Sequence, residues 1–244
     1  ENPLLTADPR LDSPAKDFVG HYSDLWTSGK AMFVCLNMVT CVRMYNLVQK
    51  YWAQEIANLE DTIRHASQQE VQELTHKLKW MQETEMAVVI SQEQNEIQTF
   101  KKWGLDILPH RAKMEKRELD KEFKDKNNPF RVVFVCAMWL TGFDVKCLSC
   151  LYLDKPLKAH TLMQTIARAN RVAEGKSNGL IVDYIGIVKA LRKALADYTA
   201  NVGEQGSTDP TIDKVELIAR IHEIIELTTS FLDSYGFDLA ALVH

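Results

Sequence analysis

Five short apolar runs, separated by segments with helical spacing, constrain the fold of this 244-residue chain more than any other feature. A continuous apolar run of about four to eight residues is typical of a strand that is buried on both faces of a sheet. The five runs are Ala31–Leu36, Ala87–Ser91, Val132–Cys136, Leu148–Asp154 and Leu180–Asp183. Strands that alternate with helices pair mainly in parallel, because each helix returns the chain to the same end of the sheet. The sequence therefore predicts an α/β fold with a mainly parallel sheet and helices on both faces.

The segments between these runs predict helices, because their apolar residues recur every three or four positions. Residues 53–83 are longer than a strand-to-strand crossover needs. They predict a helical insertion of one helix, or of two with a break near Ser67–Gln69. The other predicted helices are Asp17–Trp26, Val39–Trp52, Glu93–Trp103, Arg111–Phe123, Ala159–Arg171 and Ile187–Thr199.

Three regions are expected along the chain. Residues 1–29 are interpreted as a linker and a first helix, because the first sixteen residues contain three prolines. Residues 30–200 hold all five predicted strands and form the main domain. Residues 201–210 are polar and rich in turn-forming residues, so 201–244 are expected to begin a separate helical domain with a short C-terminal helical segment.

The composition is that of an ordinary soluble protein, with 46% hydrophobic and 25% charged residues and a net charge of −4. No apolar run is long enough to span a bilayer, and the polar N-terminus does not resemble a signal peptide, which favours a cytoplasmic location without a membrane partner. Five cysteines are an odd number without framework spacing, which suits a reducing compartment. Cys147 and Cys150 are interpreted as small buried residues, because a strand would point them to opposite faces, and no metal site is predicted.

Charge is unevenly distributed along the chain. Basic residues outnumber acidic ones in residues 101–200, and acidic residues outnumber basic ones after residue 200. This pattern fits one positive face in a larger assembly, or chance clustering on solvated helices.

Gln164, Arg168 and Arg171 form the most distinctive polar pattern, because positions i, i+4 and i+7 of a helix share one face. Guanidinium groups stay charged and bind phosphate oxygens in a fork, and a carboxamide can both donate to and accept from water. The pattern therefore predicts a phosphate clamp. The alternative is an arginine pair on the surface at the end of a helix.

Thr141 and Gly142 follow a buried strand, which is where α/β sheets place ligands. Glycine permits close backbone approach, and a hydroxyl and backbone N–H groups can hold a nucleic-acid phosphate. Lys155 follows the next strand and could also meet a phosphate. An ordinary tight turn would produce the same dipeptide, and Phe143 is interpreted as a core residue.

Four motifs in a fixed order resemble a known family. Thr141–Asp144 and Gln164–Arg171 together resemble motifs V and VI of superfamily 2 helicases and translocases. With the flanking motifs, the set is similar to the second motor domain of the R subunit of type I restriction-modification enzymes. The resemblance is strongest over residues 131–200, and it implies a RecA-like motor architecture. Met138–Leu140 belong to the same motif as Thr141–Asp144, and the two further motifs are Asp154–Lys158 and Leu180–Gly186.

The resemblance also implies a role for each candidate residue. Arg168 and Arg171 would be arginine fingers that reach the γ-phosphate of ATP bound by a first motor domain, and Gln164 would act beside them. Asp144 and Gly142 would meet the nucleotide, while Thr141, Gly142 and Lys155 would hold the DNA backbone. The implied partners are duplex DNA, a first motor domain of the same chain, and the methylation and specificity subunits of the complex.

The sequence contains no GxxxxGK[ST] loop, the element that cradles the β- and γ-phosphates. ATP and Mg²⁺ are therefore expected in a full-length subunit, and this chain alone is expected to bind neither and to be inactive. The chain is interpreted as a piece of an ATP-dependent subunit that translocates and cleaves DNA. The alternatives are a superfamily 2 DNA or RNA helicase domain that unwinds strands, and a helical scaffold with vestigial motor motifs.

Overall fold

A computed structural model describes residues 8–140, 142–169, 179–187, 189 and 222. The chain divides into two compact units, Glu1–Ile187 and Val188–His244. All of the helices and strands described below belong to the first unit. The predicted helices at Ile187–Thr199 and in residues 211–244 lie outside the described residues almost entirely.

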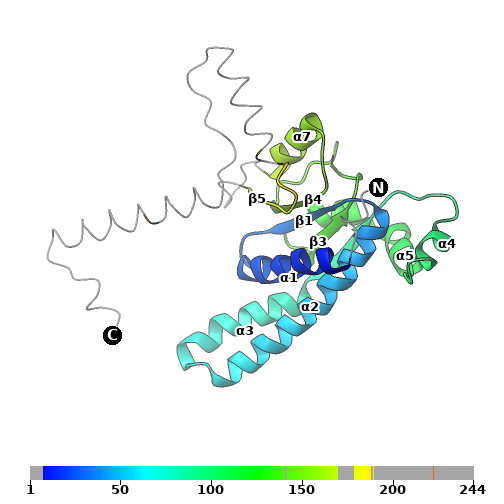
Figure 1. The fold of residues 1–244 in the computed structure, drawn as a ribbon. Coiled ribbons are helices and arrows are strands. Elements are labelled where there is room, and N and C mark those ends of the chain that lie inside the picture. The colour runs from blue at the N-terminus through cyan, green and yellow to red at the C-terminus, as the bar shows by residue number, and fades with distance from the viewer. Residues whose placement is uncertain (1–7, 141, 170–178, 188, 190–221, 223–244) are drawn as a thin grey trace, which may run out of the picture. The chain divides into compact units, whose positions relative to one another are not determined.

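Five strands form one parallel sheet in the order β2-β3-β1-β4-β5 (Figure 1). Every neighbouring pair runs in parallel, and the side chains of β1, β3 and β4 are almost completely buried. The predicted α/β class with a mainly parallel sheet is therefore confirmed. The strands are β1 (Lys30–Cys35), β2 (Glu85–Val89), β3 (Phe130–Val135), β4 (Leu148–Asp154) and β5 (Leu180–Asp183).

Seven helices surround the sheet in the described part of the chain. Figure 1 shows α1 and α2 on one side of the strands and α7 on the other, so helices cover both faces as predicted. The helices are α1 (Asp8–Asp24), α2 (Met38–His65), α3 (Gln68–Glu83), α4 (Glu96–Lys101), α5 (Leu108–Lys116), α6 (Leu119–Lys124) and α7 (Ala159–Ala169).

Helix α1 begins at Asp8, well before the predicted start at Asp17. Pro14 lies inside the helix, although proline normally disfavours a helix interior. Tertiary packing explains the difference, because helical spacing puts Leu11, Phe18 and Tyr22 on one fully buried side of α1. The burial of that stripe offsets the loss of one backbone hydrogen bond at the proline.

The predicted helix Arg111–Phe123 is wrong, because two short helices occupy that segment. Arg117 has extended backbone angles between α5 and α6, and its guanidinium pairs with Glu85 and Glu122. The pair with Glu85 joins the break between α5 and α6 to the start of β2, and the pair with Glu122 joins it to α6. The predicted helix Glu93–Trp103 is also shorter than expected, since α4 covers only Glu96–Lys101.

The predicted helical insertion is a hairpin of two helices. Helix α2 runs without a break through both the predicted crossover helix and the first half of the insertion. The hairpin turns at Ala66–Ser67, next to the predicted break, where Ser67 and Glu70 form a capping box at the start of α3. Trp52 Nε1 donates a hydrogen bond to the Met81 carbonyl at 3.0 Å and joins the two helices.

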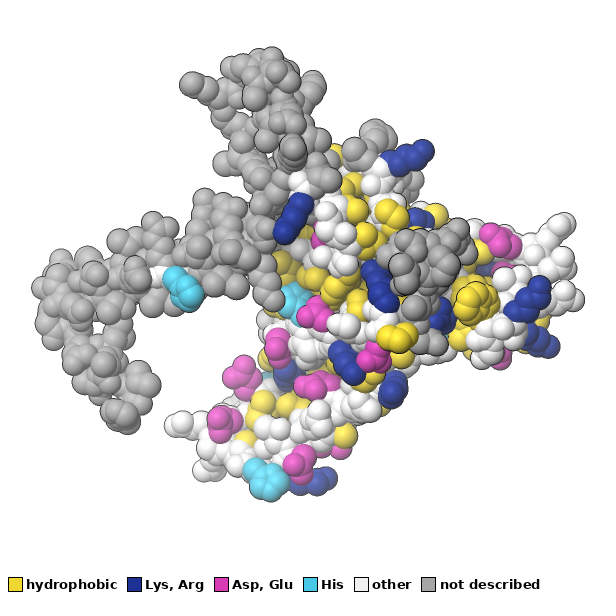
Figure 2. All heavy atoms as spheres, viewed as in Figure 1, with side chains coloured by type: hydrophobic (Ala, Val, Ile, Leu, Met, Phe, Trp, Pro, Cys, Tyr) yellow, Lys and Arg dark blue, Asp and Glu magenta, His cyan; other side chains and the backbone are white. Residues whose placement is uncertain are grey.

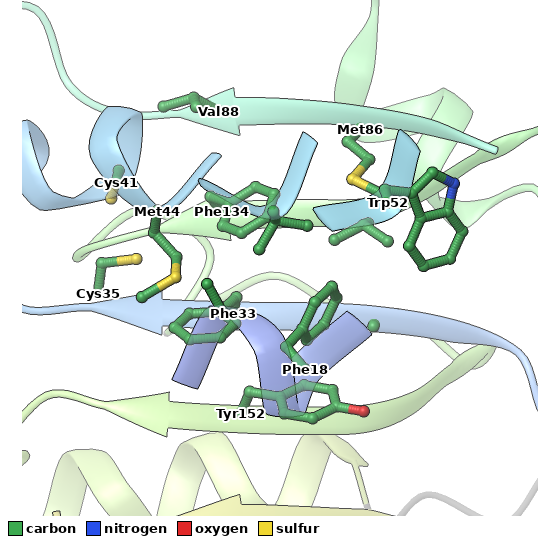
Figure 3. Packing of buried hydrophobic residues seen from close by; sticks show 14 of the residues in the cluster. Phe18, Phe33, Cys35, Cys41, Met44, Trp52, Met86, Val88, Phe134 and Tyr152 are labelled. Carbon is green, nitrogen blue, oxygen red and sulfur yellow. The ribbon is translucent and has the colours of Figure 1, made fainter. Parts of the chain in front are cut away.

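The two faces of the sheet are packed differently. Phe33, Phe134 and Tyr152 point toward α1 and α2, where they meet Phe18 in an aromatic cluster (Figure 3). Their strand neighbours point to the opposite face, since side chains alternate along a strand. That second face is built mainly of Val, Leu and Met side chains, including Met32, Val34, Val133, Val135, Leu151 and Leu153.

On the face of the molecule seen in Figure 2, Lys and Arg side chains are interspersed with Asp and Glu. At the surface of the molecule, Lys79 pairs with Glu83 and Lys121 pairs with Glu118. Exposed pairs of this kind contribute little to stability. No helix within the described ranges combines the length and the hydropathy that a membrane span requires.

Candidate functional site

The predicted site residues follow β3 and β4, at the carboxyl edge of the sheet. Parallel α/β sheets commonly bind ligands at this edge, because the connections after the strands converge there. Gly142, Asp144, Lys155 and Gln164 are described by the structure. Thr141 and Arg171 lie outside the described residues. Arg168 lies in α7, one turn after Gln164, and only its backbone position is described.

The connection between β3 and β4 carries the predicted phosphate contact at Gly142. Gly142 is exposed and has a left-handed backbone, with φ of 72°. A Cβ atom added there would meet no other atom within 4 Å, so the backbone conformation rather than the available space favours glycine. Asp144, two residues later, is exposed as well. The connection therefore presents a glycine backbone and a carboxylate to solvent.

Aromatic rings pack against each other within this connection and against α6. Trp139 stacks on Phe143, with ring centroids 4.1 Å apart and planes at 20°. Phe123 of α6 contacts Trp139 at 5.6 Å, and the Lys124 ammonium lies 4.7 Å from the Phe143 ring centroid. Phe143 is 8% exposed, which confirms its predicted core position. Residue pattern alone did not identify Trp139 as a partner of Phe143.

Lys155 lies just after β4 and is half-buried. Its Nζ atom donates a hydrogen bond to the Cys136 carbonyl at 2.6 Å. Because β1 separates β3 from β4 in the sheet, this bond reaches past the end of β1 and joins the two connections. An ammonium group has three N–H donors, so this bond leaves Lys155 with capacity for a second acceptor.

A buried ion pair at the same edge was missed by sequence analysis. Asp154, the last residue of β4, is 1% exposed, and its carboxylate pairs with the Arg10 guanidinium of α1. Burial raises the pKa of Asp154, and the hydrogen bond from Arg10 opposes that rise. The pairing residues are far apart in sequence, and Arg10 lies in a segment predicted as linker, so no local pattern could have shown it.

Three buried cysteines also gather near the ends of β1 and β3. Cys35, Cys41 and Cys136 are all buried, and burial raises the pKa of both Cys35 and Cys41. A buried thiol with a raised pKa is a poor nucleophile, so these residues act as small core groups. All five cysteines are free thiols, including Cys147 and Cys150 of the CxxC pair.

The described edge offers hydrogen-bonding chemistry rather than covalent chemistry. Gln164 is exposed on α7, the helix that follows β4, while Gly142 and Asp144 are exposed in the connection after β3. These groups suit phosphate oxygens, ribose hydroxyls and water as partners. Within the described residues, no group of His, Cys, Asp and Glu side chains could hold a metal ion.

The sheet and its carboxyl-edge connections define a parallel α/β domain of the kind that binds ligands at its strand ends. Residues 27–186 match the family described as type I restriction enzyme subunit R domain 3. This match covers more than half of the chain, so the chain belongs to that family. The resemblance to the R subunit of type I restriction enzymes is thereby confirmed, and all seven predicted site residues lie inside the matched range.

Individual relatives agree with the family assignment. The chain is 35% identical over 209 residues to the type I restriction enzyme HindI endonuclease subunit of Haemophilus influenzae, a match that covers 82% of the chain and 17% of the relative. It is 34% identical over 227 residues to a Methanocaldococcus jannaschii protein assigned as the MjaIXP endonuclease subunit, covering 92% of the chain and 18% of that protein. The chain thus spans less than a fifth of the length of either relative.

A solved structure of low similarity belongs to the same kind of protein. It is a fragment assigned to the HsdR subunit of a type I restriction enzyme from Vibrio vulnificus YJ016. The match covers 74% of this chain and 29% of that chain, with 15% sequence identity and a TM-score of 0.46.

Proposed function

We propose that this chain is the second motor domain of a type I restriction enzyme R subunit, in which it helps to drive the movement of duplex DNA. The observation that carries this proposal is the position of α7. The helix follows β4 at the carboxyl edge and carries exposed Gln164 one turn before Arg168. Family membership supports the proposal, because relatives carry the name of restriction endonuclease subunits.

In the proposed mechanism, Arg168 and Arg171 neutralise the negative charge that develops on a phosphoryl group during its transfer. Gln164 orients the attacking water or holds a phosphate oxygen, since its carboxamide can donate and accept. ATP with Mg²⁺, held by a first motor domain of the same protein, supplies the transferable phosphoryl group. The chain's own residues fit only one side of such a site, because the sequence lacks a phosphate-binding loop.

The DNA contact in this proposal is made by the connection after β3. The exposed, left-handed Gly142 allows a phosphate to approach the backbone closely, with Thr141 beside it in sequence. Lys155 can add a charge-assisted contact through its remaining N–H donors. Asp144 meets the nucleotide ribose. Contacts of this kind hold the DNA backbone without reading its sequence, which fits a division of labour with specificity and methylation subunits.

Cleavage of DNA is proposed for the whole subunit and not for this chain. The chain spans under a fifth of its relatives' length, and the described residues hold no metal-binding cluster of the kind that many nucleases use. Within this chain the proposed work is therefore limited to the ATP-driven step.

The test of this proposal is the substitution Arg168→Ala in the R subunit that contains this chain. Removing an arginine finger is expected to lower DNA-stimulated ATP turnover by about a thousandfold or more. The melting temperature should stay unchanged, because an arginine finger acts on the phosphoryl group and not on the fold. Arg168→Lys keeps the charge but not the planar fork, and should recover only a small part of the rate.

The matched control is Arg64→Ala, which removes an exposed arginine near the end of α2 that pairs only weakly with Asp61. It should retain full turnover. Near-normal ATP turnover in Arg168→Ala would show that this arginine is structural, and would refute the proposed motor role of α7.

A further inference from the structure

Trp139 has an unusual backbone conformation for its residue type. Among the described residues other than glycine, only Asn95 and Trp139 have positive φ values, of 59° and 68°. Asparagine visits this left-handed region fairly often, whereas a bulky side chain rarely does. A strained residue persists only where its surroundings hold it in place, and such residues concentrate at functional sites.

The contacts of the Trp139 ring can keep its backbone in this left-handed conformation. Its ring stacks on Phe143 at 4.1 Å and meets Phe123 of α6 at 5.6 Å. Phe123 in turn packs against Phe130, the first residue of β3, at 5.0 Å. These four rings form a continuous aromatic row on the second face of the sheet. Offset contacts of this kind add stabilisation beyond the burial of ring surface.

The row encloses a short stretch of backbone. Trp139 and Phe143 are four residues apart, and no helix joins them, so their stack brings the chain back on itself around Gly142. Leu140 is 3% exposed and fixes the beginning of this stretch, whereas Gly142 is exposed. The exposed glycine therefore stands between two buried residues of the chain, Leu140 and Phe143.

We propose that Trp139 is a positioning residue, whose stack on Phe143 holds the exposed Gly142 backbone in the left-handed conformation in which it contacts a DNA phosphate. This inference rests on the proposed function only in naming DNA as the ligand. Fixing the backbone before binding matters, because each residue that becomes ordered on binding weakens the observed affinity. The stack of Trp139 on Phe143 orders the Gly142 backbone before DNA binds.

The experiment uses the R subunit and two readouts. The first is hydrogen exchange of the amides between residues 137 and 145. The second is the concentration of a plain duplex that gives half-maximal ATP turnover, measured separately from the maximal turnover. Trp139→Ala should speed amide exchange in this stretch and raise the half-maximal duplex concentration about tenfold, the cost of ordering about one residue on binding. Maximal turnover should stay within about twofold, because the arginines of α7 are untouched.

Three variants separate the ring from other effects. Trp139→Phe should recover most of the duplex affinity, because a phenyl ring can still stack. Trp139→Gly accepts the left-handed backbone without strain but has no ring, so it should behave like Trp139→Ala. Trp103→Ala is the control, because Trp103 is 55% exposed and contacts Arg43 instead of the aromatic row.

The outcomes are distinct. An unchanged half-maximal duplex concentration in Trp139→Ala, with normal DNA-stimulated turnover, would overturn the inference and leave the proposed function standing. Normal binding by Trp139→Gly would also overturn it, because the ring would then be dispensable. Absence of any DNA-stimulated turnover in the unmodified subunit would refute the proposed function, and the inference with it.

Discussion

The two faces of the sheet differ in what covers them. The face toward α1 and α2 is filled with aromatic rings. The ring centroid of Phe33, for example, lies within 6.0 Å of the ring centroids of Phe18, Phe134 and Tyr152. The covering helices have 17 and 28 residues. The opposite face carries aliphatic side chains, and its covers include the six-residue α6 and the connection that holds Gly142. Two long helices thus cover one face, whereas a short helix and the connection of the candidate site help to cover the other.

The largest expected effect compares two neighbouring residues of β1 that point to opposite faces. Phe33→Ala should lower the free energy of unfolding by about 3–5 kcal/mol, because it leaves a cavity among four rings. Val34→Ala removes less apolar volume and should cost about 2 kcal/mol. Both residues are 0% exposed, so burial is matched. Urea unfolding followed by circular dichroism measures both, and equal losses would contradict the comparison.

The next effect concerns the buried ion pair of the aromatic side. Arg10→Met leaves the Asp154 carboxylate buried without its cation, which should cost about 3 kcal/mol at neutral pH. Asp154→Asn should cost less, about 1–2 kcal/mol, because the remaining guanidinium is 23% exposed and can reach water.

The pH dependence of Arg10→Met follows from the raised pKa of Asp154. A folded-state pKa above the unfolded value makes the folded state bind the proton first, so stability is gained as the pH falls through the folded-state pKa. Losing Arg10 raises this pKa further. The deficit of Arg10→Met relative to the unmodified chain should therefore shrink between pH 7 and pH 4, as measured by urea unfolding. A deficit that stays constant over this range would show that the pair is not electrostatically important.

The last effect is a pH dependence on the aliphatic side, where β1 begins with a buried cation. Lys30 is 2% exposed, its Nζ donates to the Glu122 carbonyl at 2.9 Å, and burial lowers its pKa from 10.5 to about 8. Between these two values the unfolded state binds more protons, so stability rises with pH. Relative to Lys30→Met, the unmodified chain should gain up to about 1.4 kcal/mol per pH unit over this range. Parallel pH profiles of the two proteins would contradict the assignment.

Much of the fold was predictable because the strands are continuous apolar runs. The predicted limits of β4 and β5 coincide with the observed ones, since Pro156 follows the end of β4 and Gly179 precedes the start of β5. The start of α1 was not predictable, because its buried stripe stabilises a helix through a proline. The break at Arg117 depends on ion pairs with Glu85 and Glu122, which only the folded chain brings together.

Sequence analysis named the residues of the candidate site, and these stay predictions, but it did not name the contacts that support them. Residue spacing indicated Gln164 and Arg168, and a strand followed by glycine indicated Gly142, because these signals are local. The stack of Trp139 on Phe143 requires a left-handed tryptophan, which no pattern favours. The pairing of Arg10 with Asp154 joins the first helix to the fourth strand. Both supports depend on contacts that exist only after the sheet has formed.

The strand order also sets the sequence of events when the chain is made. β1 lies at the centre of the sheet, yet its partners β3 and β4 follow it only after α2, α3, β2 and three further helices. The α2–α3 hairpin can close early, because its contacts are local, whereas β1 must wait with its hydrogen-bonding edges unpaired. An exposed apolar strand of this kind favours aggregation during synthesis. Helix α2, which follows β1 immediately and packs on it, is therefore well placed to cover the apolar face of this strand before the rest of the sheet forms.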